Sequence, residues 1–399
     1  MLLYILCFII LLIILFFIYI RLKYRFWAIQ PVFHFYDLYY WIINVGIIRH
    51  ELPEKNKYVN LTNIKTTTFN GLDELTKKSI ALLIKLNYLR NGENKYEPTM
   101  SNIEPYFVGH SDTCYWSYFI DKELFIDNKT NKTIEENKII GVISSRPLHV
   151  NIKSNSFDIY YVDFLCVSKN HRKKNIAPQL IQTHEYNQSH NNRNICVSLF
   201  KREEELTGIV PLTIYKTYCF NMNKIHIEPE MNTHITILTA DKQNMYYLYN
   251  HLNEIKTKWD ITIYPNISNL IELVSTKNMY IKMLLIDRDI DTIYIFRKTC
   301  VYIEGNKEII SCIASIKGDE LTNIEFVKYF KLSLYSILNE KDGNKNIFTY
   351  LTIEDVSDNR QLISNICETA FPIAVSPMAY FFYNFAHNSF QSNKCLILN

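Results

Sequence analysis

The 399-residue chain is long enough for two domains, or for one large unit with two lobes and a sizeable core. Its residues are 48% hydrophobic and 21% charged, which excludes an intrinsically disordered protein. The formal net charge is only +3, without a long run of lysine and arginine, so we expect no nucleic-acid partner. The nine cysteines lack Cys-x-x-Cys spacing and the histidines lack metal-ligand spacing, which predicts reduced thiols and no metal site.

The amino-terminal segment, residues 1–20, contains no charged side chain and is almost entirely apolar. At 1.5 Å per residue, about 20 helical residues span the roughly 30 Å hydrocarbon core of a bilayer. Arg21, Lys23 and Arg25 follow directly, which predicts that the rest of the chain faces the cytosol. A cleaved signal peptide is the alternative, but no basic residue precedes the apolar run and no small-x-small cleavage sequence follows it. We therefore expect a single-pass membrane protein whose first segment is the transmembrane anchor.

In the first half of the remaining chain, the sequence pattern predicts an alternation of helices and strands. Residues 21–60 form an aromatic stretch and then a linker with some helical character. The clearest strands are 139–152 and 157–168, because both are rich in Ile, Val, Phe and Tyr and a Lys-Ser-Asn-Ser turn separates them. The other predicted elements are a helix at 72–89, a turn at 91–97, a basic loop at 171–175, a helix at 177–190 and a strand at 195–200.

The second half repeats this order in looser form. The pattern predicts two related α/β lobes, which we place at 61–230 and 231–399. The elements expected in the second lobe are a strand at 234–238, a helix at 242–256, a hairpin of 294–303 and 308–315 around Gly305, a helix at 325–338 and a strand at 346–353.

The basic loop that precedes the helix at 177–190 is the strongest chemical signal. The first backbone N–H groups of a helix have no partner inside the helix, and the helix dipole adds partial positive charge there. Arg172, Lys173 and Lys174 add full charges, and Pro178 suits a first helical turn. These residues fit a phosphate site, and they fit equally well a basic surface loop after an ordinary buried strand.

Residues around this loop resemble the signature of the eukaryotic N-myristoyltransferases. Asp163 to Val167 is similar to the family's Asn-Phe-Leu-Cys sequence, and 172–181 is similar to its Arg-Ser-Lys-Arg-Leu-Ala-Pro sequence. Several matches in the same order make the resemblance specific and extend it over most of the chain. The others lie at Tyr24 to Val32, Gly141 to Ser144, Tyr380 to Asn384, and the apolar end from Cys395 to Asn399.

The resemblance implies a duplicated GNAT-like (acyl-CoA N-acyltransferase) α/β fold with pseudo-twofold lobes, preceded by one transmembrane helix. It also implies an enzyme that transfers myristate from myristoyl-CoA to the N-terminal glycine of a protein. Myristoyl-CoA is then a co-substrate rather than a bound cofactor, with the first lobe binding acyl-CoA and the second facing the peptide. The expected partners are acyl-CoA, glycine-ended proteins or peptides, and the lipid bilayer. The alternatives are an inactive acyl-CoA- or lipid-binding homologue and a GNAT N-acetyltransferase.

The resemblance also implies roles for individual residues. The backbone N–H groups of Phe164 and Leu165 form the oxyanion hole for the thioester oxygen. The α-carboxylate of Asn399 is the base, since a glycine ammonium of pKa about 8 must lose a proton before it attacks. The implied contacts to acyl-CoA are Tyr24, Arg25, Phe26, Trp27, Cys166, Val167, Arg172, Lys173, Lys174, Asn175, Ile176, Ala177 and Pro178, and those to the peptide are Asp163, Thr207 and Tyr88.

The chain departs from the family where the family binds basic residues of its peptides. The family's acidic stretch is replaced by Arg90, Asn91, Gly92 and Glu93, and its glycine-rich loop by residues 370–376, so we expect a different peptide preference or no peptide at all. Tyr161 and Asp163 stand where the signature has Glu and Asn, and Ser168 stands where it has His. Asp163 adds a negative charge beside the expected glycine site, which favours an ammonium group there.

Overall fold

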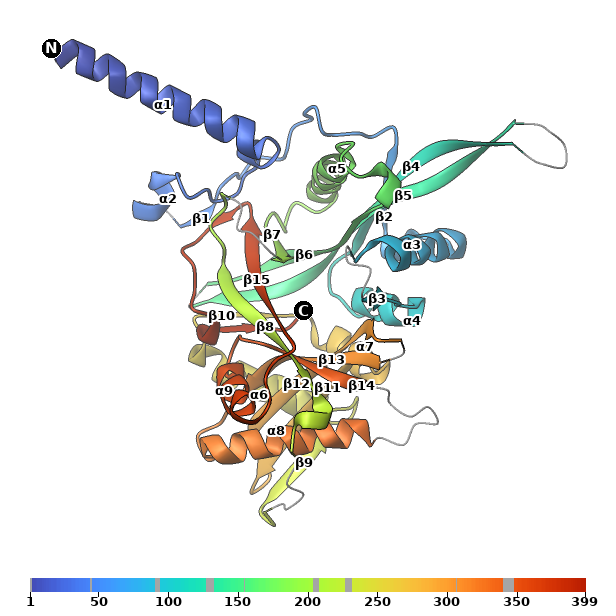
Figure 1. Cartoon of the computed structure of the whole chain (residues 1–399), viewed down its shortest axis with the longest axis vertical. Helices are drawn as coiled ribbons and strands as arrows, with labels where there is room; N and C mark the ends of the chain where they lie inside the picture. Colours follow the sequence, from blue (N-terminus) through green and yellow to red (C-terminus); the bar gives the residue numbers. More distant parts are fainter. Residues whose placement is uncertain are drawn as a thin grey trace.

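In the computed structural model, a long twisted sheet runs through the molecule, with helices packed against it and one helix projecting freely (Figure 1). The structure describes residues 2–43, 45–89, 94–126, 133–153, 155–203, 208–226, 232–305, 307–339 and 348–399. Fifteen of the described strands belong to this sheet. Its main path runs β17, β10, β5, β6, β7, β15, β8, β14, β13, β12, β11, β9.

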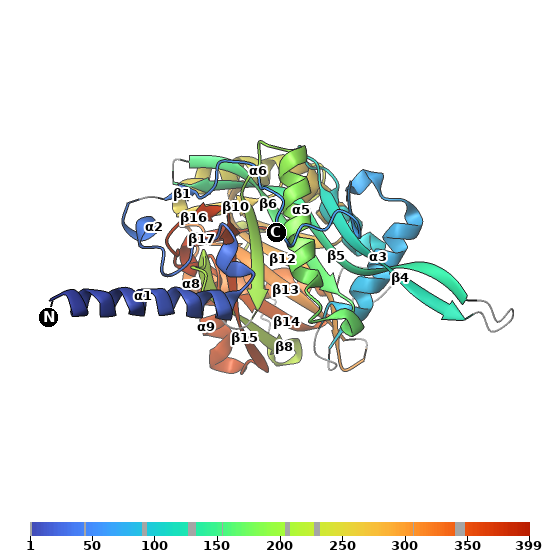
Figure 2. The same cartoon turned by 90° about the horizontal axis from the view of Figure 1, so that it is seen from above.

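The first half of the sheet is an antiparallel meander followed by a helical crossover. The strand pair predicted at 139–152 and 157–168 is confirmed as β5 and β6. Helix α5 then lies over β5 and β6 (Figure 2) and returns the chain to β7, which pairs with β6 in parallel. The elements are β2 (Ile64–Thr68), β4 (Tyr115–Ile126), β5 (Thr133–Ile152), β6 (Asn155–Val167), α5 (Ile176–Asn191) and β7 (Ser198–Glu203).

The second half contains the same kind of unit. Three strands run antiparallel, a helix crosses over, and the next strand pairs in parallel with the last of the three. The hairpin predicted around Gly305 is confirmed as β12 and β13. The elements are β9 (Ile235–Thr239), β11 (Met279–Ile286), β12 (Asp289–Ile303), β13 (Lys307–Ile316), α8 (Asn323–Leu338) and β14 (Phe348–Glu354).

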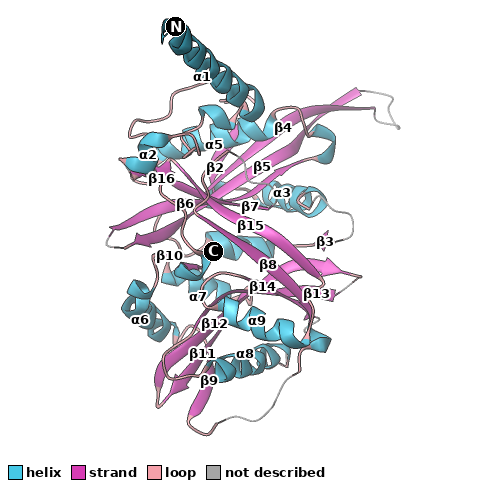
Figure 3. Cartoon of the chain, turned by 60° about the vertical axis from the view of Figure 1, so that its left-hand side comes forward, coloured by secondary structure: helices cyan, strands magenta, loops and turns pink. Residues whose placement is uncertain are grey.

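Two antiparallel strands join the halves into one sheet, as the continuous run of magenta strands in Figure 3 shows. Strand β15 (Ala374–Tyr383) pairs with β7, and its neighbour β8 (Thr213–Asn221) pairs with β14. The first half of the sheet therefore contains β15 from the later part of the chain, and the second half contains β8 from the earlier part. At the far edge of the first half, β10 (Ile261–Tyr264) pairs with β5 and, in parallel, with β17 (Cys395–Ile397).

The smaller elements cover the sheet and its edges. The helix predicted at 72–89 is α3, whose first turn begins after Asp73 because that side chain accepts the Thr76 N–H at 2.8 Å. The segment predicted as a turn at 91–97 includes a short strand, β3, paired with β12, while its residues 91–93 lie outside the described chain. The remaining elements are η1 (Trp27–Ile29), α2 (Leu38–Ile42), β1 (Gly46–Ile47), η2 (Phe69–Gly71), α3 (Glu74–Asn87), β3 (Lys95–Tyr96), α4 (Met100–Ile103), η3 (Glu104–Phe107), η4 (Lys169–His171), η5 (Met222–Lys224), α6 (Met245–Ile255), η6 (Lys256–Lys258), α7 (Ile267–Ser275), α9 (Asn359–Thr369), β16 (Phe385–Ala386) and η7 (Ser392–Lys394).

The amino-terminal helix α1 (Leu2–Tyr24) stands apart from this body (Figure 1). In the described part of the chain, it is the helix that is long and apolar enough to cross a membrane, judged by length and composition. Its side chains are exposed along almost the whole length, and only Ile20 is buried. The helix continues through Arg21 and Lys23, so it ends a little later than the predicted segment 1–20.

Candidate active site

A bulge in β6 turns two peptide groups out of the sheet. Opposite β5, Asp163 pairs with Ser144 and Cys166 pairs with Val142, so β6 has one residue more than β5 in this stretch. Phe164 lies in the extra step and has a φ of 50°, which is strained for a residue with a side chain. The N–H groups of the bulged residues therefore point away from the regular ladder and are placed to bind an oxygen of another group.

Aromatic packing holds the bulge in its strained shape. The Phe164 ring is buried and stacks on Trp116, with ring centroids 5.9 Å apart. Phe107 and Tyr88 contact the same ring at 6.2 and 5.9 Å. By contrast Leu165 is 39% exposed, so this residue faces open space beside the bulge. The backbone strain is thus sustained by a packed aromatic cluster on one side only.

The Phe164 N–H already has a partner within the chain. It donates to Oδ1 of Asp163 at 2.8 Å. The main-chain oxygen of Asp163 accepts a hydrogen bond from the Ser144 hydroxyl at 3.1 Å. An incoming oxygen at this N–H must therefore displace the Asp163 carboxylate.

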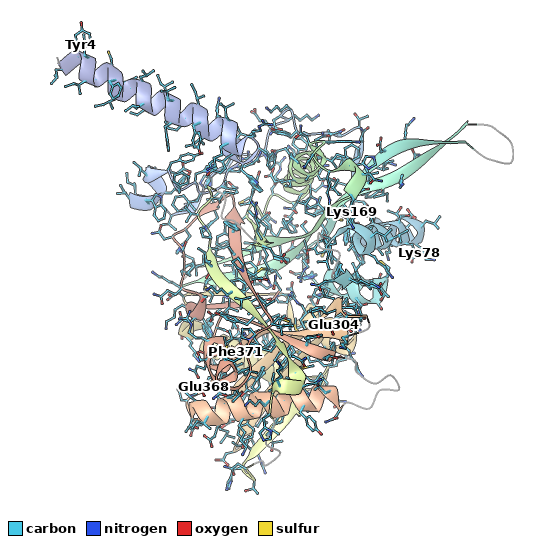
Figure 4. All side chains as sticks on the ribbon, viewed as in Figure 1. Tyr4, Lys78, Lys169, Glu304, Glu368 and Phe371 are labelled. Carbon is cyan, nitrogen blue, oxygen red and sulfur yellow. The ribbon has the colours of Figure 1, made fainter. Side chains whose placement is uncertain are left out.

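The basic loop after β6 leads straight into α5, and Figure 4 labels Lys169 near the beginning of this loop. Asn175, the residue before the helix, is in the left-handed conformation and makes no side-chain capping bond. The first turn of α5 contains no acidic residue, and both Lys173 and Lys174 are exposed. This helix start therefore offers free N–H groups and positive charge without a competing carboxylate from its own turn.

Arg172 makes hydrogen bonds within the chain, whereas Lys173 and Lys174 are exposed. Its Nη2 donates to the main-chain oxygen of Asn87 at 2.6 Å, and its Nε donates to that of Val167 at 3.3 Å. The side chain of Asn87 in turn accepts the Lys169 N–H at 2.9 Å. Arg172 thus ties the end of α3 to the end of β6 and shapes the loop.

Gly141 is needed where α5 approaches β5. A Cβ at this position would lie 2.8 Å from Cδ1 of Leu180. Leu180 is fully buried, so it has little room to move. The glycine therefore allows the helix to lie close to the strand that faces the bulge.

The last strand, β17, brings Asn399 to the centre of the molecule (Figures 1 and 3). Leu398 donates its N–H to the main-chain oxygen of Ile263 at 2.7 Å, which continues the parallel pairing with β10. Leu396 and Leu398 enter one hydrophobic core cluster, while Cys395 and Ile397 enter another. Alternate side chains thus anchor the strand on both faces, and Asn399 itself is 2% exposed.

The main-chain oxygen of Asn399 accepts a hydrogen bond from Nη1 of Arg297 at 3.0 Å. The Asn399 side-chain oxygen accepts one from the Tyr380 hydroxyl at 3.2 Å. Its amide nitrogen, Nδ2, is buried and has no partner in the described chain. The main-chain oxygen and the side-chain oxygen of Asn399 are therefore both hydrogen-bonded. Its side-chain N–H groups have no acceptor in the described chain.

A buried charge cluster lies behind Asn399. Glu354 forms ion pairs with Lys201 at 2.9 Å and with Arg297 at 3.6 Å, and it accepts the Tyr215 hydroxyl at 2.8 Å. Burial by itself would raise the pKa of Glu354, but the two cations outweigh this and lower it. Arg297 thus joins an ionised carboxylate to Asn399, and Tyr380 joins the same region from β15.

Arg146 is a second buried cation near the bulge. It lies on β5 opposite Tyr161, and its guanidinium carbon is 5.1 Å from the Tyr161 ring centre and 4.9 Å from that of Tyr106. The residue is 1% exposed, and its Nε and Nη1 atoms have no hydrogen-bond partner within the described residues. Two aromatic faces therefore stabilise this charge in place of a carboxylate.

The fold around this site has a known counterpart. The structure of *Saccharomyces cerevisiae* N-myristoyltransferase with bound myristoyl-CoA aligns with a TM-score of 0.68 at 11% sequence identity, covering 93% of this chain and 94% of the yeast chain. The fold is that of the N-myristoyltransferases. A tandem GNAT protein from the clavulanic acid biosynthesis pathway aligns with a TM-score of 0.52 at 9% identity, covering 82% of this chain and all of that one. The predicted α/β, GNAT-like fold is therefore confirmed.

The sequence similarity is concentrated in the first half. Residues 53–212 match the family model of the N-terminal domain of myristoyl-CoA:protein N-myristoyltransferase. A putative glycylpeptide N-tetradecanoyltransferase of *Amsacta moorei* entomopoxvirus is 26% identical over 175 residues, covering 43% of this chain and 54% of the relative. The *Plasmodium falciparum* glycylpeptide N-tetradecanoyltransferase is 27% identical over 169 residues, covering 41% and 38%. The matches thus span about half the length of these relatives or less.

The residues that resemble the N-myristoyltransferase signature, 163–178, form one continuous structural unit. Phe164, Leu165, Cys166 and Val167 form the bulge and the end of β6, and the loop from Arg172 leads to Ile176, Ala177 and Pro178 in the first turn of α5. Cys166 is buried, and burial raises the pKa of its thiol to about 12, so it remains an uncharged packing residue. Tyr88 contacts the Phe164 ring, which places it beside the bulge, and its role in peptide binding stays a prediction.

The amino-terminal residues of the predicted acyl-CoA site lie on another part of the first half. Trp27 stacks on Phe200 of β7 at 5.5 Å, and Phe26 is buried against Tyr58 at 5.2 Å. In the described chain, no hydrogen bond, ion pair or ring contact joins Tyr24 to Trp27 with the loop at 172–178, so their common role stays a prediction. Thr207 lies outside the described residues.

Sequence reasoning did not identify the charged residues around Asn399. Lys201, Arg297 and Glu354 come from β7, β12 and β14, far apart along the chain. Each looks like an ordinary charge on a strand until the strands are placed side by side. The local signal that they share is a charged residue directly after an apolar one within a strand, as in Arg297 after Phe296 of β12.

Proposed function

We propose that this protein is a glycylpeptide N-myristoyltransferase-like enzyme, which transfers a myristoyl group from myristoyl-CoA to the N-terminal glycine of a protein. The observation that carries the proposal is the strained bulge at Phe164, which leads directly into the basic start of α5. This arrangement occurs within the fold of the yeast enzyme that binds myristoyl-CoA, and in the region that matches the family model. The names of the relatives support the same reaction.

In this proposal the first half binds the acyl donor. The thioester oxygen accepts hydrogen bonds from the N–H groups of Phe164 and Leu165, and the CoA phosphates lie at the start of α5 with Lys173 and Lys174. Arg172 positions this loop through its bonds to main-chain oxygens. Tyr24 to Trp27 cover the CoA from the β7 side.

The proposed base lies at the end of β17. In a protein that ends at Asn399, the oxygen held by Arg297 belongs to an α-carboxylate. This carboxylate takes a proton from the glycine ammonium, and the free amine attacks the thioester carbon. The negative charge that develops on the thioester oxygen is stabilised at the bulge, and then the C–S bond breaks. CoA leaves as the thiolate and is protonated, while the new amide loses its extra proton.

Asp163 links the two substrates in this scheme. Its carboxylate occupies the Phe164 N–H before substrate is present, at 2.8 Å. A glycine ammonium attracts the carboxylate, since opposite charges form strong charge-assisted hydrogen bonds. The N–H is then free for the thioester oxygen, so peptide binding prepares the oxyanion hole.

We also propose the finer features that the resemblance implies. The two strand–helix–strand units, β5–β6–α5–β7 and β12–β13–α8–β14, correspond to duplicated lobes with a pseudo-twofold relation, divided near residue 230. Helix α1 anchors the protein as a single-pass membrane protein with the catalytic unit in the cytosol. Arg21, Lys23 and Arg25 support that orientation. The modified lipoproteins are then released beside a bilayer.

A second candidate is an acyl-CoA-binding homologue without transferase activity. The hydrogen bond from Phe164 to Asp163 favours it, because a carboxylate that stayed in place would repel the developing oxyanion. In that case the basic helix start still binds acyl-CoA. The two candidates differ in whether a peptide substrate moves Asp163.

The test uses the full chain in detergent, with labelled myristoyl-CoA and a library of peptides that begin with glycine. We expect label in the peptide fraction, and none with the same peptides beginning with alanine. Binding of labelled acyl-CoA without transfer to any peptide would establish the second candidate. Failure to bind myristoyl-CoA would exclude both.

The base is tested separately by adding one glycine after Asn399. The extension moves the terminal carboxylate away from Arg297, so transfer should fall at least about 100-fold, as expected for loss of a general base. Binding of acyl-CoA should remain, because the loop before α5 is unchanged. Unaltered turnover in this variant would show that the base is another group.

A further inference from the structure

An apolar surface lies beside the base of α1. It consists of residues 35–43 and Val45, which we call the flanking patch. In Figures 1 and 2, α2, the helical part of this patch, lies on the same side of the molecule as the projecting α1. Its large apolar side chains are exposed in the isolated chain, Ile42 by 79%, Ile43 by 74% and Leu38 by 68%. The other exposed members are Phe35, Tyr39, Trp41 and Val45.

The flanking patch is fixed to the body rather than hanging from it. The Phe35 N–H donates to the main-chain oxygen of Gly208 at 3.2 Å, and the Val210 N–H donates to that of Phe33 at 2.7 Å. The rings of Tyr24 and Phe35 both pack so closely on Gly208 that a Cβ there would lie 3.0 to 3.1 Å from them. The end of α1 and the start of the patch are therefore held by the same segment.

The patch also runs back along α1. Tyr36 makes edge contacts with Phe16 and Phe17, at ring-centre distances of 6.3 and 6.4 Å. Phe16 and Phe17 lie 8 and 7 positions before Tyr24, the end of the helix. At 1.5 Å per residue, Tyr36 is therefore about 10 to 12 Å along the helix axis from that end. A bilayer that surrounds α1 must reach this part of the patch.

The polar groups of the patch are compatible with such an environment. Trp41 donates its indole N–H to the main-chain oxygen of Phe35 at 3.0 Å, so the ring can leave water without losing a hydrogen bond. The side chain of Asp37, the charged residue of the patch, accepts the His34 N–H at 3.0 Å. Tryptophan and tyrosine next to aliphatic residues are typical of the membrane–water interface.

We propose that the flanking patch is a membrane-embedded surface, which enters the lipid leaflet next to the body together with the last turns of α1. Its partner is the interfacial region of the bilayer, where acyl chains meet headgroups. Two contacts, α1 and the patch, then fix the orientation of the body against the bilayer, whereas a single helix would leave it free to rotate and tilt. This inference rests on the proposal that α1 spans a membrane.

The surface test measures tryptophan fluorescence of the full chain in phosphatidylcholine vesicles. Vesicles with bromine near the headgroup end of the acyl chains should quench part of the emission. The Trp41→Phe variant should lose most of that quenched component. Trp259→Phe is the matched control, since Trp259 is buried in the core of the second half and should contribute none of it.

A second pair of variants separates embedding from folding. Leu38→Asp with Ile42→Asp should move Trp41 into water, with loss of lipid quenching and new quenching by iodide. Leu75→Asp with Leu82→Asp places the same charges on exposed positions of α3, on the other side of the body, and should leave the signal unchanged.

The outcomes distinguish this inference from the anchor proposal. If the wild-type chain does not float with vesicles, the anchor proposal fails, and the present one fails with it. If the chain floats but Trp41 is quenched by iodide and by no brominated lipid, the patch lies in water. That result would overturn the inference while α1 remains an anchor.

Discussion

The two halves of the sheet contain the same strand–helix–strand unit, but their helix starts carry opposite charges. Before α8, Thr322 and Glu325 form a capping box, with the Glu325 N–H 3.3 Å from the Thr322 hydroxyl oxygen and the Thr322 N–H 3.0 Å from the Glu325 carboxylate. Before α5, Asn175 makes no side-chain cap and the loop is basic. The start of α8 is satisfied by its own side chains, whereas the start of α5 has no side-chain cap.

The strands that lead into these helices differ in the same way. In β6, Phe164 has a positive φ and the bulge exposes peptide groups, whereas no residue of β13 has a positive φ. The strand that precedes the crossover helix is thus strained in the first half and free of this backbone strain in the second. The same strand–helix–strand arrangement therefore carries a strained bulge in the first half and a side-chain-capped helix start in the second.

The largest effect that separates the two halves should come from Phe164→Ala. Removal of a buried phenylalanine costs about 3–5 kcal/mol of unfolding free energy, measured by denaturant titration. Phe330→Ala on α8 is the matched control, because this ring is fully buried against Phe296 at 5.5 Å. Both variants should lose similar stability, but only Phe164→Ala should lose acyl transfer. Equal transfer activity in the two, at a temperature where both are folded, would contradict the role of the bulge.

Buried glutamates of the two halves should respond to pH in opposite directions. Burial raises the pKa of Glu185 on α5 from 4.5 to about 7, despite its ion pair with Arg49 at 3.1 Å. The folded state favours the neutral carboxyl group of Glu185. Its contribution to the free energy of unfolding is therefore complete below pH 4.5 and is lost as the pH rises through 7. The change amounts to about 3 kcal/mol at most. For Glu354, whose pKa is lowered, stability is present above the unfolded pKa and is lost as the pH falls.

Unfolding titrations across this pH range check the contrast. The Glu185→Gln variant should show a flatter profile between pH 4.5 and 7, since the group no longer titrates. The profile at lower pH should be unchanged, because Glu354 is intact. A wild-type protein that becomes more stable from pH 4.5 to 7 by the same margin would contradict the assignment for Glu185.

A smaller effect should follow from the charges before α5. Replacing Lys173 and Lys174 together by alanine should weaken binding of CoA roughly 10-fold and reduce its dependence on salt. Lys242→Ala is the control, because it is an exposed lysine in the loop before another helix, α6. Isothermal titration with CoA measures both. If Lys242→Ala weakened binding as much as the double variant, the effect would be one of net charge alone.

The smallest effect concerns the caps themselves. Thr322→Ala should lower stability by about 1 kcal/mol, because the first turn of α8 loses its acceptor. Asn175→Gly should change stability by less than about 0.5 kcal/mol, because Asn175 has a φ of 59° and makes no capping bond. Thermal unfolding measures both. A larger loss at Asn175 would show that its side chain serves the helix.

The sequence alone determined the features that depend on local pattern. The continuous apolar run gave α1, alternating β-branched and aromatic residues gave β5, β6, β12 and β13, and the basic loop marked the start of α5. These elements are predictable because backbone hydrogen bonding and side-chain periodicity act over a few residues. The Phe-Leu pair at 164 and 165 was identified differently, through the resemblance of residues 163–167 to the N-myristoyltransferase signature.

Only the tertiary structure decided which distant residues meet. Asn399 lies beside Arg297 because β17 adds in parallel to β10, and Glu354 joins them because β14 follows a helical crossover. The hydrogen bond from Phe164 to Asp163, and the contact of Tyr36 with Phe16, likewise depend on exact backbone paths. Such contacts have no local pattern, because packing of strands far apart in sequence creates them. The amino-acid sequence thus specified the apolar helix α1 and the basic loop before α5, while folding alone built the charged centre between the two halves.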